Sequence, residues 1–439
     1  MEQNGASGVG QAVNIPERDE TAEPAEELGI LAGSPAGMAL LALIALNLLD
    51  FVDRSLLSGA QPVIQRQLHA TDARLGGVTS GFFIAYMVAA PLVGWLGDRL
   101  PRRILVPLSV IWWSCALGAA TLGTNFRWFP LGYIMVGIAQ ASFGVYSVAM
   151  VSDYYPRANR TRALSLFLLA MNGGRALGIP LGGSLAESFG WQTPFRLMAA
   201  VGLILGLWAM KFFYEPGQPV APRSDSLASG GSRPSAFSAI LSKGYLGAAL
   251  GLAMVNFVLG GLSVWLPTYL CRFAGYSVSR AGATVGAITL VCGIGGTWFG
   301  GVLGEKLYRG DQRGLYWMSA GCLLLAVPFA FTILSYSQGP ILFGIIGTQL
   351  FVFLTIGPLN AALLNSVPSW MRSTAVAIEI FLIHALGDGL SPRLIGVISD
   401  ARGLRLGLAT TAVALTIGGL LVFAGTEKTP VFEGDPAQR

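Results

Sequence analysis

Long apolar runs separated by short polar connections dominate the chain. Runs of roughly 18 or more mostly apolar residues, the length that an α-helix needs to cross a bilayer, can be placed twelve times. They lie near residues 36–62, 75–97, 104–124, 128–151, 161–186, 191–213, 245–270, 280–304, 315–337, 340–366, 372–398 and 405–425. The pattern predicts an all-α membrane protein with twelve transmembrane helices.

The connection between the sixth and seventh runs differs from the others in composition. Residues 214–243 contain four prolines and a stretch rich in serine and glycine, which is typical of a flexible connector. We therefore expect a six-helix bundle at 35–213, a cytoplasmic linker at 214–243 and a second six-helix bundle at 244–426.

Both ends of the chain are polar. Residues 1–34 are acidic and have neither the basic start nor the apolar core of a signal peptide, so we expect a disordered cytoplasmic tail. Residues 427–439 are expected to form a short C-terminal tail.

The composition supports this class and excludes several others. The chain is 53% hydrophobic and 12% charged, with a mean hydropathy of +0.61. The net charge of +5 comes from basic residues scattered over short connections without interleaved aromatics, which argues against a nucleic-acid partner. Four isolated cysteines and two distant histidines indicate neither a disulfide framework nor a metal site. No GxxxxGK[ST] loop is present, which argues against an ATP-driven pump.

Lysine and arginine indicate the orientation. Connections on one predicted side carry Arg99, Arg102, Arg103, Arg157, Arg160, Arg162, Lys306, Arg309 and Arg313. By the positive-inside rule this side is cytoplasmic, and both termini lie there. The opposite connections also carry arginines, which makes the bias modest: Arg66, Arg74, Arg127, Arg272, Arg280, Arg402 and Arg405.

Three charges fall inside the first apolar run. Asp50 lies about 20 Å from the start of that run, so Asp50, Asp53 and Arg54 are predicted near mid-membrane. A charge there costs about 2.5 to 3.5 kcal/mol, and such residues normally face a protein interior or an aqueous cavity. Their spacing allows all three to share one helix face. We expect this face to line a transport cavity; the alternative is a buried ion pair that only fixes helix packing.

One connection carries a motif that is repeated in the second half. Residues 94–103 read GWLGDRLPRR, and residues 300–309 read GGVLGEKLYR. Small residues let a helix end approach its neighbour, and an acid followed by basic residues can bridge the gap between helices. The predicted conformational gate comprises Gly94, Gly97, Asp98, Arg99, Arg102, Arg103, Asp153, Glu305 and Arg309. A loop that acts only as a topology signal is the alternative.

The repeated motif resembles the loop signature of the major facilitator superfamily, although Pro101 replaces the usual second glycine. The resemblance implies two six-helix bundles that rock about a midplane site and open alternately to either side.

The fifth run combines a glycine stripe with a central cation. Gly174, Gly178 and Gly182 recur every four residues, so one helix face should permit close contact with a neighbour. Arg175 lies about 20 Å into this run. It either pairs with Asp50 or Asp53, or binds an anionic substrate group, and the sequence leaves both open.

Further stretches resemble the Spinster branch of this superfamily. The most specific are GLSVWLPTYL at 261–270 and GDGLSPRLIGVISD at 387–400. The branch comprises proton-linked carriers of lysophospholipids and sphingosine phosphates, with bacterial relatives. Asp53 and Arg54 fall on the family's acidic–basic pair in the first helix, where the resemblance places proton coupling and head-group recognition.

The fourth run departs from that family pattern. Tyr133 and Gln140 stand where the resemblance implies an arginine and a glutamate, and Asp50 stands at a position that is usually asparagine. We hypothesise that proton binding has moved to Asp50 and Asp53, because glutamine can bind substrate but cannot carry a proton.

Other candidate site residues lie in the two halves. The predicted proton-coupling set is Asp50, Asp53, Arg54 and Glu379, and the predicted substrate-binding set is Arg54, Tyr86, Gln140, Arg175, Trp265 and His384. His384, one turn from Asp388, has the chemistry of a proton relay, but a hydrogen-bonded core histidine is the favoured interpretation. The aromatic residues fit an amphiphile's tail or ordinary packing.

Together these features predict a proton-coupled secondary active transporter of a lipid-like amphiphile, without enzymatic activity or cofactors other than protons. We expect a multi-pass monomer in a bacterial inner membrane, with both termini cytoplasmic and with membrane lipids as its surroundings. The alternatives are a major facilitator carrier of small organic anions or drugs, and a non-transporting receptor or scramblase.

Overall fold

The computed structural model describes residues 34–97, 99–123, 126–155, 157–214, 239–308, 311–368 and 371–428. Within these ranges the regular structure is helical, and twelve helical segments are long and apolar enough to cross a membrane. The first six helices are α2 (Pro35–Leu68), α3 (Asp72–Gly97), α4 (Arg102–Ala120), α5 (Phe129–Tyr154), α6 (Arg157–Phe189) and α7 (Gln192–Ala209). The all-α class and the twelve spans are therefore confirmed.

The second half has the same number of spans. Its elements are α9 (Lys243–Phe273), α10 (Val278–Tyr308), α11 (Arg313–Ile333), α12 (Gln338–Asn365), α13 (Arg372–Leu382), η2 (Ile383–Asp388), α14 (Ser391–Arg402) and α15 (Leu404–Ala424). The span at Thr374–Arg402 joins most of α13 to the π-helix η2 and to α14. Most of the predicted tails and linker lies outside the described residues.

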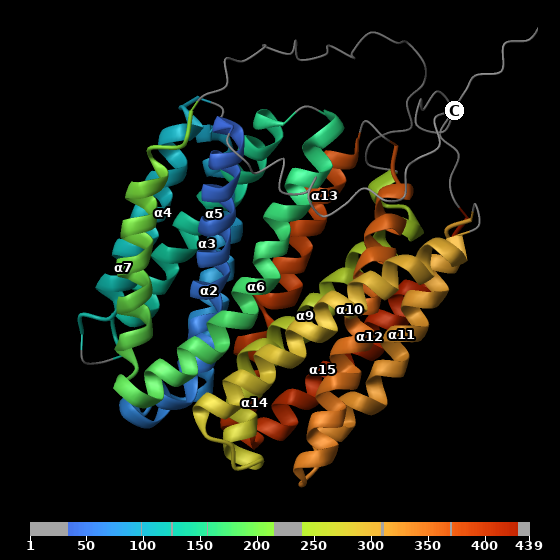
Figure 1. Ribbon diagram of the computed structural model, residues 1–439. Helices are drawn as coiled ribbons and strands as arrows, with labels where there is room; N and C mark the ends of the chain where they lie inside the picture. The colour runs from blue at the N-terminus through green and yellow to red at the C-terminus, as the bar shows by residue number, and fades with distance from the viewer. Residues whose placement is uncertain are drawn as a thin grey trace, which may run out of the picture.

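The helices form two bundles, blue to green and yellow to red in Figure 1. Each bundle has a hydrophobic core of its own, drawn from residues 39–213 and 239–422. Among the described residues, two buried core members cross over: Ile179 of α6 packs in the second core and Val278 of α10 in the first. Burial of apolar side chains thus stabilises each bundle separately, and α6 and α10 join them.

The glycine stripe of α6 sets the distance to α2. A Cβ atom added at Gly174, Gly178 or Gly182 would lie 2.6, 2.4 or 2.3 Å from a backbone oxygen of α2. No side chain fits at these distances, so the two helices pack backbone to backbone. The close contact predicted for this face is confirmed, and it holds α2 rigidly in the first bundle.

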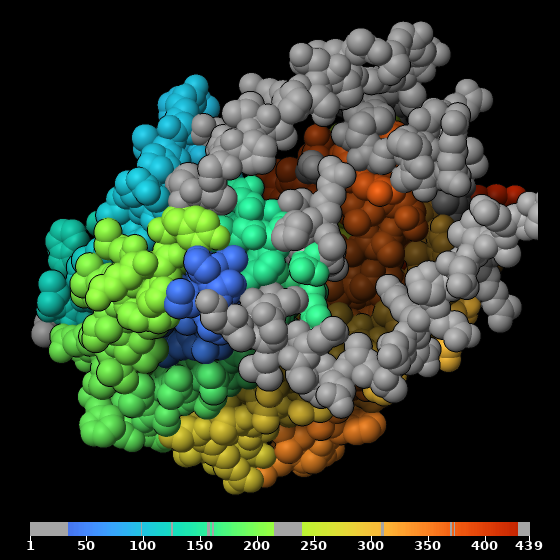
Figure 2. Space-filling model, turned by 45° about the horizontal axis from the view of Figure 1, so that its top comes forward, coloured from blue at the N-terminus to red at the C-terminus, as the bar shows by residue number. Residues whose placement is uncertain are grey.

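The two bundles meet at the end of the molecule opposite to the start of α2. There Gly76 of α3 packs against Pro392 of α14, and Gly282 of α10 packs against Ile179 and Pro180 of α6. Figure 2 brings the other end forward and shows a hollow between the green and the orange segments. The molecule is therefore closed at one end and open at the other.

Candidate functional site

The centre of the site is the guanidinium of Arg54 on α2. Its Nη2 lies 2.9 Å from Asp50 Oδ2 in an ion pair one helical turn away, and its Nε donates to Gln140 Oε1 of α5 at 3.1 Å. Asp50 and Gln140 are buried, with 1% and 0% exposure. The guanidinium is thus held by one charged and one neutral acceptor, which fixes its orientation.

Aromatic rings surround the same group. The Cζ atom of Arg54 lies 4.8 Å from the ring centre of Phe51, 5.5 Å from that of Phe82 and 4.8 Å from that of Tyr86. The hydroxyl of Tyr86 points at α5 beside Gly144, where a Cβ would lie 2.4 Å from it. Ring faces attract a cation, so these residues stabilise the buried charge and add an apolar wall to the site.

Asp53 turns away from Arg54. Its Oδ2 accepts from Trp113 Nε1 of α4 at 3.1 Å, inside the first bundle. Tyr133 of α5 donates its hydroxyl to the backbone carbonyl of Asp53 at 3.2 Å. The prediction of one shared face thus holds for Asp50 and Arg54 but is wrong for Asp53, because the indole of Trp113 offers it a donor on another side.

Three buried polar atoms of this cluster are left without a partner in the described part of the chain. They are Asp50 Oδ1, Asp53 Oδ1 and Gln140 Nε2. An unmade hydrogen bond of a buried polar group costs about 1 to 3 kcal/mol, and more for a charged group. The site therefore has unused capacity to bind a proton at a carboxylate and to donate a hydrogen bond from an amide.

Arg175 of α6 lies beside this cluster without joining it. Its Cζ atom lies 5.2 Å from the ring centre of Phe51, and among the described residues it forms no ion pair. In this structure Arg175 does not pair with Asp50 or Asp53, because Asp50 pairs with Arg54 and Asp53 accepts from Trp113. A partly exposed guanidinium whose donors have no acceptor among the described residues favours the other alternative, an anionic group of the substrate.

The second bundle contributes His384 and Asp388 from η2. His384 Nδ1 lies 2.9 Å from Asp388 Oδ1. The imidazole stacks on Phe83 of α3 with ring centres 5.6 Å apart, and meets Tyr86 edge-on at 5.5 Å. The ring is thus hydrogen-bonded, as the favoured interpretation of His384 expects, but it packs against α3 of the other bundle, and its role as a proton relay stays a prediction.

Two other predicted residues lie apart from Arg54. Glu379 of α13 is 7% exposed and forms no ion pair among the described residues. Trp265 of α9 is fully buried, and its indole N–H donates to the Pro392 carbonyl at 3.0 Å. Trp265 thus packs α9 against α14, and the structure does not bring it to the Arg54 cluster.

Comparison with known proteins assigns this arrangement to a family. The sequence model described as Major Facilitator Superfamily matches residues 43–392. The chain belongs to the major facilitator superfamily. Its members are transporters and not enzymes, so the twelve helices around Arg54 form the body of a transporter.

Relatives place this transporter in the Spinster branch. It is 29% identical to protein spinster homolog 1 of Homo sapiens, over 90% of this chain and 81% of the relative. It is 30% identical to sphingosine-1-phosphate transporter SPNS2 of Danio rerio, over 81% of this chain and 74% of the relative. Among solved structures, the chain shares its fold with a bacterial homolog to the human lysosomal transporter Spinster in an inward-facing and occupied conformation. The TM-score is 0.79 and the sequence identity is 22%, and the match covers 90% of this chain and 97% of that chain.

The residues predicted as a gate in this Spinster-branch transporter lie at its open end. Asp98 and Arg309 fall outside the described residues. Arg102 Nη1 pairs with Asp153 Oδ2 at 2.9 Å, and Arg99 lies 3.7 Å from the ring centre of Trp95. Both contacts stay within the first bundle.

The other predicted gate residues that the structure describes lie on α3, α4 and α10. Gly97 packs on Tyr146, whereas a Cβ at Gly94 would meet no other atom within 4 Å. Arg103 is exposed on the first turn of α4. Glu305 lines a cavity of about 370 Å³ among α10, α11 and α12, within the second bundle.

Polar residues at the closed end were missed by the sequence analysis. Arg272 of α9 holds Asp72 of α3 with two hydrogen bonds, Nη1 to Oδ2 at 2.8 Å and Nη2 to Oδ1 at 2.6 Å. Ser399 of α14 also donates to Asp72, and the carboxylate of Asp400 accepts from the backbone N–H groups of Asp72 and Ala73, both at 2.9 Å. The bundles are thus joined by charge and by a cap on the first turn of α3.

A second cap of the same kind lies between α6 and α10. Glu187 near the end of α6 accepts from the backbone N–H groups of Val278 at 3.2 Å and Ser279 at 2.9 Å. The sequence feature that could have predicted these contacts is the set of arginines on the predicted outward side. One of them, Arg272, pairs with an acid of the other bundle.

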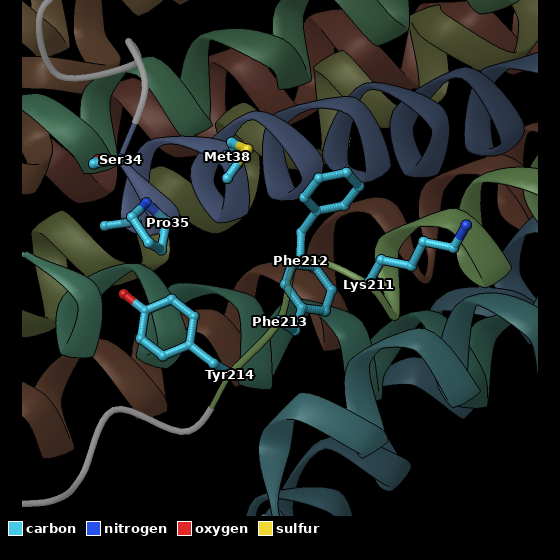
Figure 3. A pocket seen from close by; sticks show the side chains of 8 residues that line it. Ser34, Pro35, Met38, Lys211, Phe212, Phe213 and Tyr214 are labelled. Carbon is cyan, nitrogen blue, oxygen red and sulfur yellow. The ribbon is translucent and has the colours of Figure 1, made fainter.

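A cavity of about 540 Å³ lies far from Arg54, at the open end. Its lining comes from the start of α2 and the segment after α7, including Met38, Lys211, Phe212 and Phe213 (Figure 3). Met38 precedes Arg54 by 16 residues, or about 24 Å along the helix. This cavity is therefore separate from the central site.

Proposed function

We propose that this protein is a proton-coupled carrier of an amphiphile with an anionic or zwitterionic head, of the lysophospholipid or sphingosine-phosphate type. The observation that carries the proposal is the Arg54 guanidinium, which is 13% exposed at mid-membrane depth and is held by Asp50 and Gln140. A cation fixed at that depth suits a phosphate group better than it suits neutral solutes.

Two further features support an amphiphile. The rings of Phe51, Phe82 and Tyr86 provide apolar surface next to the cation, which fits the junction of a polar head and an acyl chain. The zebrafish relative is a sphingosine-1-phosphate transporter, so the chemistry of the site and the name of a relative agree. Arg175 and Gln140 Nε2 supply additional donors for the head group.

Proton coupling is assigned to Asp50 and Asp53. Each has a buried oxygen without a partner, so binding a proton removes the cost of an unsolvated charge. Protonation of Asp50 would also weaken its ion pair with Arg54 and free the guanidinium for the head group. Proton binding and substrate binding are coupled through this one ion pair.

Alternating access would proceed by rocking of the two bundles. The ion pair and caps around Asp72 and Glu187 hold one end shut while the other is open. With both termini in the cytoplasm, as the distribution of basic residues predicts, the open end would face inward. Rupture of this network would accompany the outward-open state.

Transport by the purified protein in lipid vesicles tests the substrate class. We expect uptake of a labelled lysophospholipid driven by a pH gradient, no uptake of small carboxylates, and at least a tenfold loss in Arg54→Gln, which keeps polarity and removes the charge. Asp311→Asn, a loop carboxylate that pairs with Arg313, is the matched control and should transport normally. Uptake of carboxylates but not of lysolipid would overturn the proposal in favour of an organic-anion carrier.

A further inference from the structure

The second bundle holds a titratable pair that the proposed coupling through Asp50 and Asp53 does not use. His384 and Asp388 lie one turn apart on η2, joined at 2.9 Å. Each side chain keeps 13% of its surface exposed, so water in the site can reach both. The pair faces α3 of the first bundle through Phe83 and Tyr86.

The backbone is built to hold this pair at the interface. Residues Ile383–Asp388 form a π-helix, and Gly387 has a non-helical conformation at φ −95° and ψ −107°. A Cβ at Gly387 would lie 2.9 Å from the Ala253 carbonyl oxygen of α9, and one at Gly260 of α9 would lie 2.8 Å from Asp388 Cβ. Such π-helical turns inside α-helices occur mostly at functional sites.

We propose that His384, oriented by Asp388, is a second proton-binding site whose occupancy is linked to the anionic head group bound at Arg54. This inference rests on the proposed function, because it needs an anionic substrate. An ionised carboxylate only accepts, so Nδ1–H of His384 donates to Asp388 and Nε2 is the nitrogen that gains the proton. The proton comes from water and converts the imidazole to an imidazolium ion that remains paired with Asp388.

The charges around the pair explain the linkage. Arg54 and Arg175 both interact electrostatically with Asp388, and as cations they oppose a further positive charge on His384. Of the nearby acids, Asp50 forms an ion pair with Arg54. Glu379 of α13 interacts electrostatically with His384, and a negative charge on Glu379 favours the imidazolium form.

In the described part of the chain, the remaining elements that pack on the pair meet it through neutral groups. Tyr86 meets the imidazole from α3, α9 approaches Asp388 through Gly260, and Arg393 on α14 is exposed. An anionic head group beside Arg54 cancels the opposing charge. The proton therefore binds His384 more tightly when the head group is bound at Arg54, and by the same coupling the head group binds more tightly when His384 is protonated.

The chain contains two histidines, which makes a direct test feasible. His69 is exposed at the end of α2 with φ 49°, a conformation that asparagine tolerates. In the His69→Asn protein labelled with ¹⁵N-histidine, nuclear magnetic resonance reports His384 alone. We expect its protonated fraction at fixed pH to increase when a lysophospholipid with a free phosphate is added.

Variants and ligand binding separate the possible outcomes. Asp388→Asn should lower the protonated fraction of His384 at the same pH, and His384→Gln should reduce the pH dependence of lysolipid affinity by up to about tenfold per pH unit. If the lipid raises the melting temperature but does not change the His384 signal, either with Asp388 present or in the Asp388→Asn variant, this inference is overturned and the proposed function stands. Absence of any lipid-induced stabilisation of the wild-type protein would overturn the proposed function itself.

Discussion

At the scale of single residues, neutral side chains of α5 lie next to the charged groups of α2. Gln140 accepts from Arg54, and Tyr133 donates to the backbone of Asp53. Both contacts satisfy polar atoms without a second ion pair. The two acids of α2 have different environments, since Asp50 faces a cation and Asp53 faces an indole.

Trp113→Phe tests the environment of Asp53. The change removes the N–H that donates to Asp53 Oδ2 and leaves both carboxylate oxygens without a partner. We expect a loss of about 1 to 3 kcal/mol in the free energy of unfolding at high pH, where the carboxylate is charged, and a smaller loss at low pH, where it is protonated. Thermal unfolding in detergent across a pH series measures it.

The same substitution in an Asp53→Asn background is the control. There the carboxylate is absent, so Trp113→Phe should cost less and the cost should not depend on pH. An equal, pH-independent loss in both backgrounds would mean that the indole matters for packing alone.

At the scale of elements, the packing of α2 on α6 is the most constrained contact around the site. The stripe Gly174, Gly178 and Gly182 lies against backbone oxygens of α2 in the segment that carries Asp50 and Arg54. Any separation of these helices moves the charged cluster. The position of Arg54 thus depends on residues that never touch it.

Gly178→Ala should therefore be destabilising although alanine is the better helix former. Its Cβ would lie 2.4 Å from the Val52 carbonyl oxygen, and forcing the backbones apart costs about 1 to 3 kcal/mol. Gly301→Ala in α10 is the matched control, because a Cβ there meets no other atom within 4 Å. Melting temperatures of the two variants decide the matter, and a Gly178→Ala protein as stable as the control would contradict the packing argument.

The elements also mark what the sequence could predict. Hydrophobic runs located all twelve spans, and four-residue spacing identified both the Asp50–Arg54 pair and the glycine face. The turn of Asp53 toward Trp113 was not predictable, because it depends on which helix lies beside α2. The π-helix at Ile383–Asp388 was missed for a similar reason: Gly387 adopts its conformation against α9, a tertiary contact that local pattern does not contain.

At the scale of the whole molecule, the two bundles are joined at one end by an ion pair and two helix caps. Asp400 at the end of α14 caps α3, and Glu187 near the end of α6 caps α10. The equivalent positions of these contacts in the two halves suggest one shared task. Together with the Arg272–Asp72 pair they stabilise the conformation that is closed at this end.

Removing that pair should shift the balance between conformations. Arg272→Ala leaves Asp72 without its cation. If the closed conformation loses about 1.4 kcal/mol of stability relative to the open one, the population that is open at this end rises roughly tenfold. Ser80→Cys in a protein without native cysteines provides the probe, since Ser80 is 2% exposed and bonds to the Arg393 backbone across the interface. Thiol labelling should be faster in Arg272→Ala.

Arg280→Ala is the control for this experiment. Arg280 lies in the first turn of α10 on the same side of the molecule, but it stacks on Tyr276 and forms no ion pair among the described residues. Labelling at an unchanged rate in Arg272→Ala, or equal acceleration in both variants, would contradict the role of the pair.

The central claim is that a buried acid of α2 carries the proton that drives the substrate. The most direct measurement compares net accumulation of lysophospholipid under a pH gradient with lipid exchange at equal pH, in wild-type, Asp50→Asn and Asp53→Asn proteins. We predict that at least one variant loses accumulation and keeps exchange, because a neutral amide binds no proton but leaves the carrier able to alternate. Accumulation equal to wild type in both variants would contradict the account.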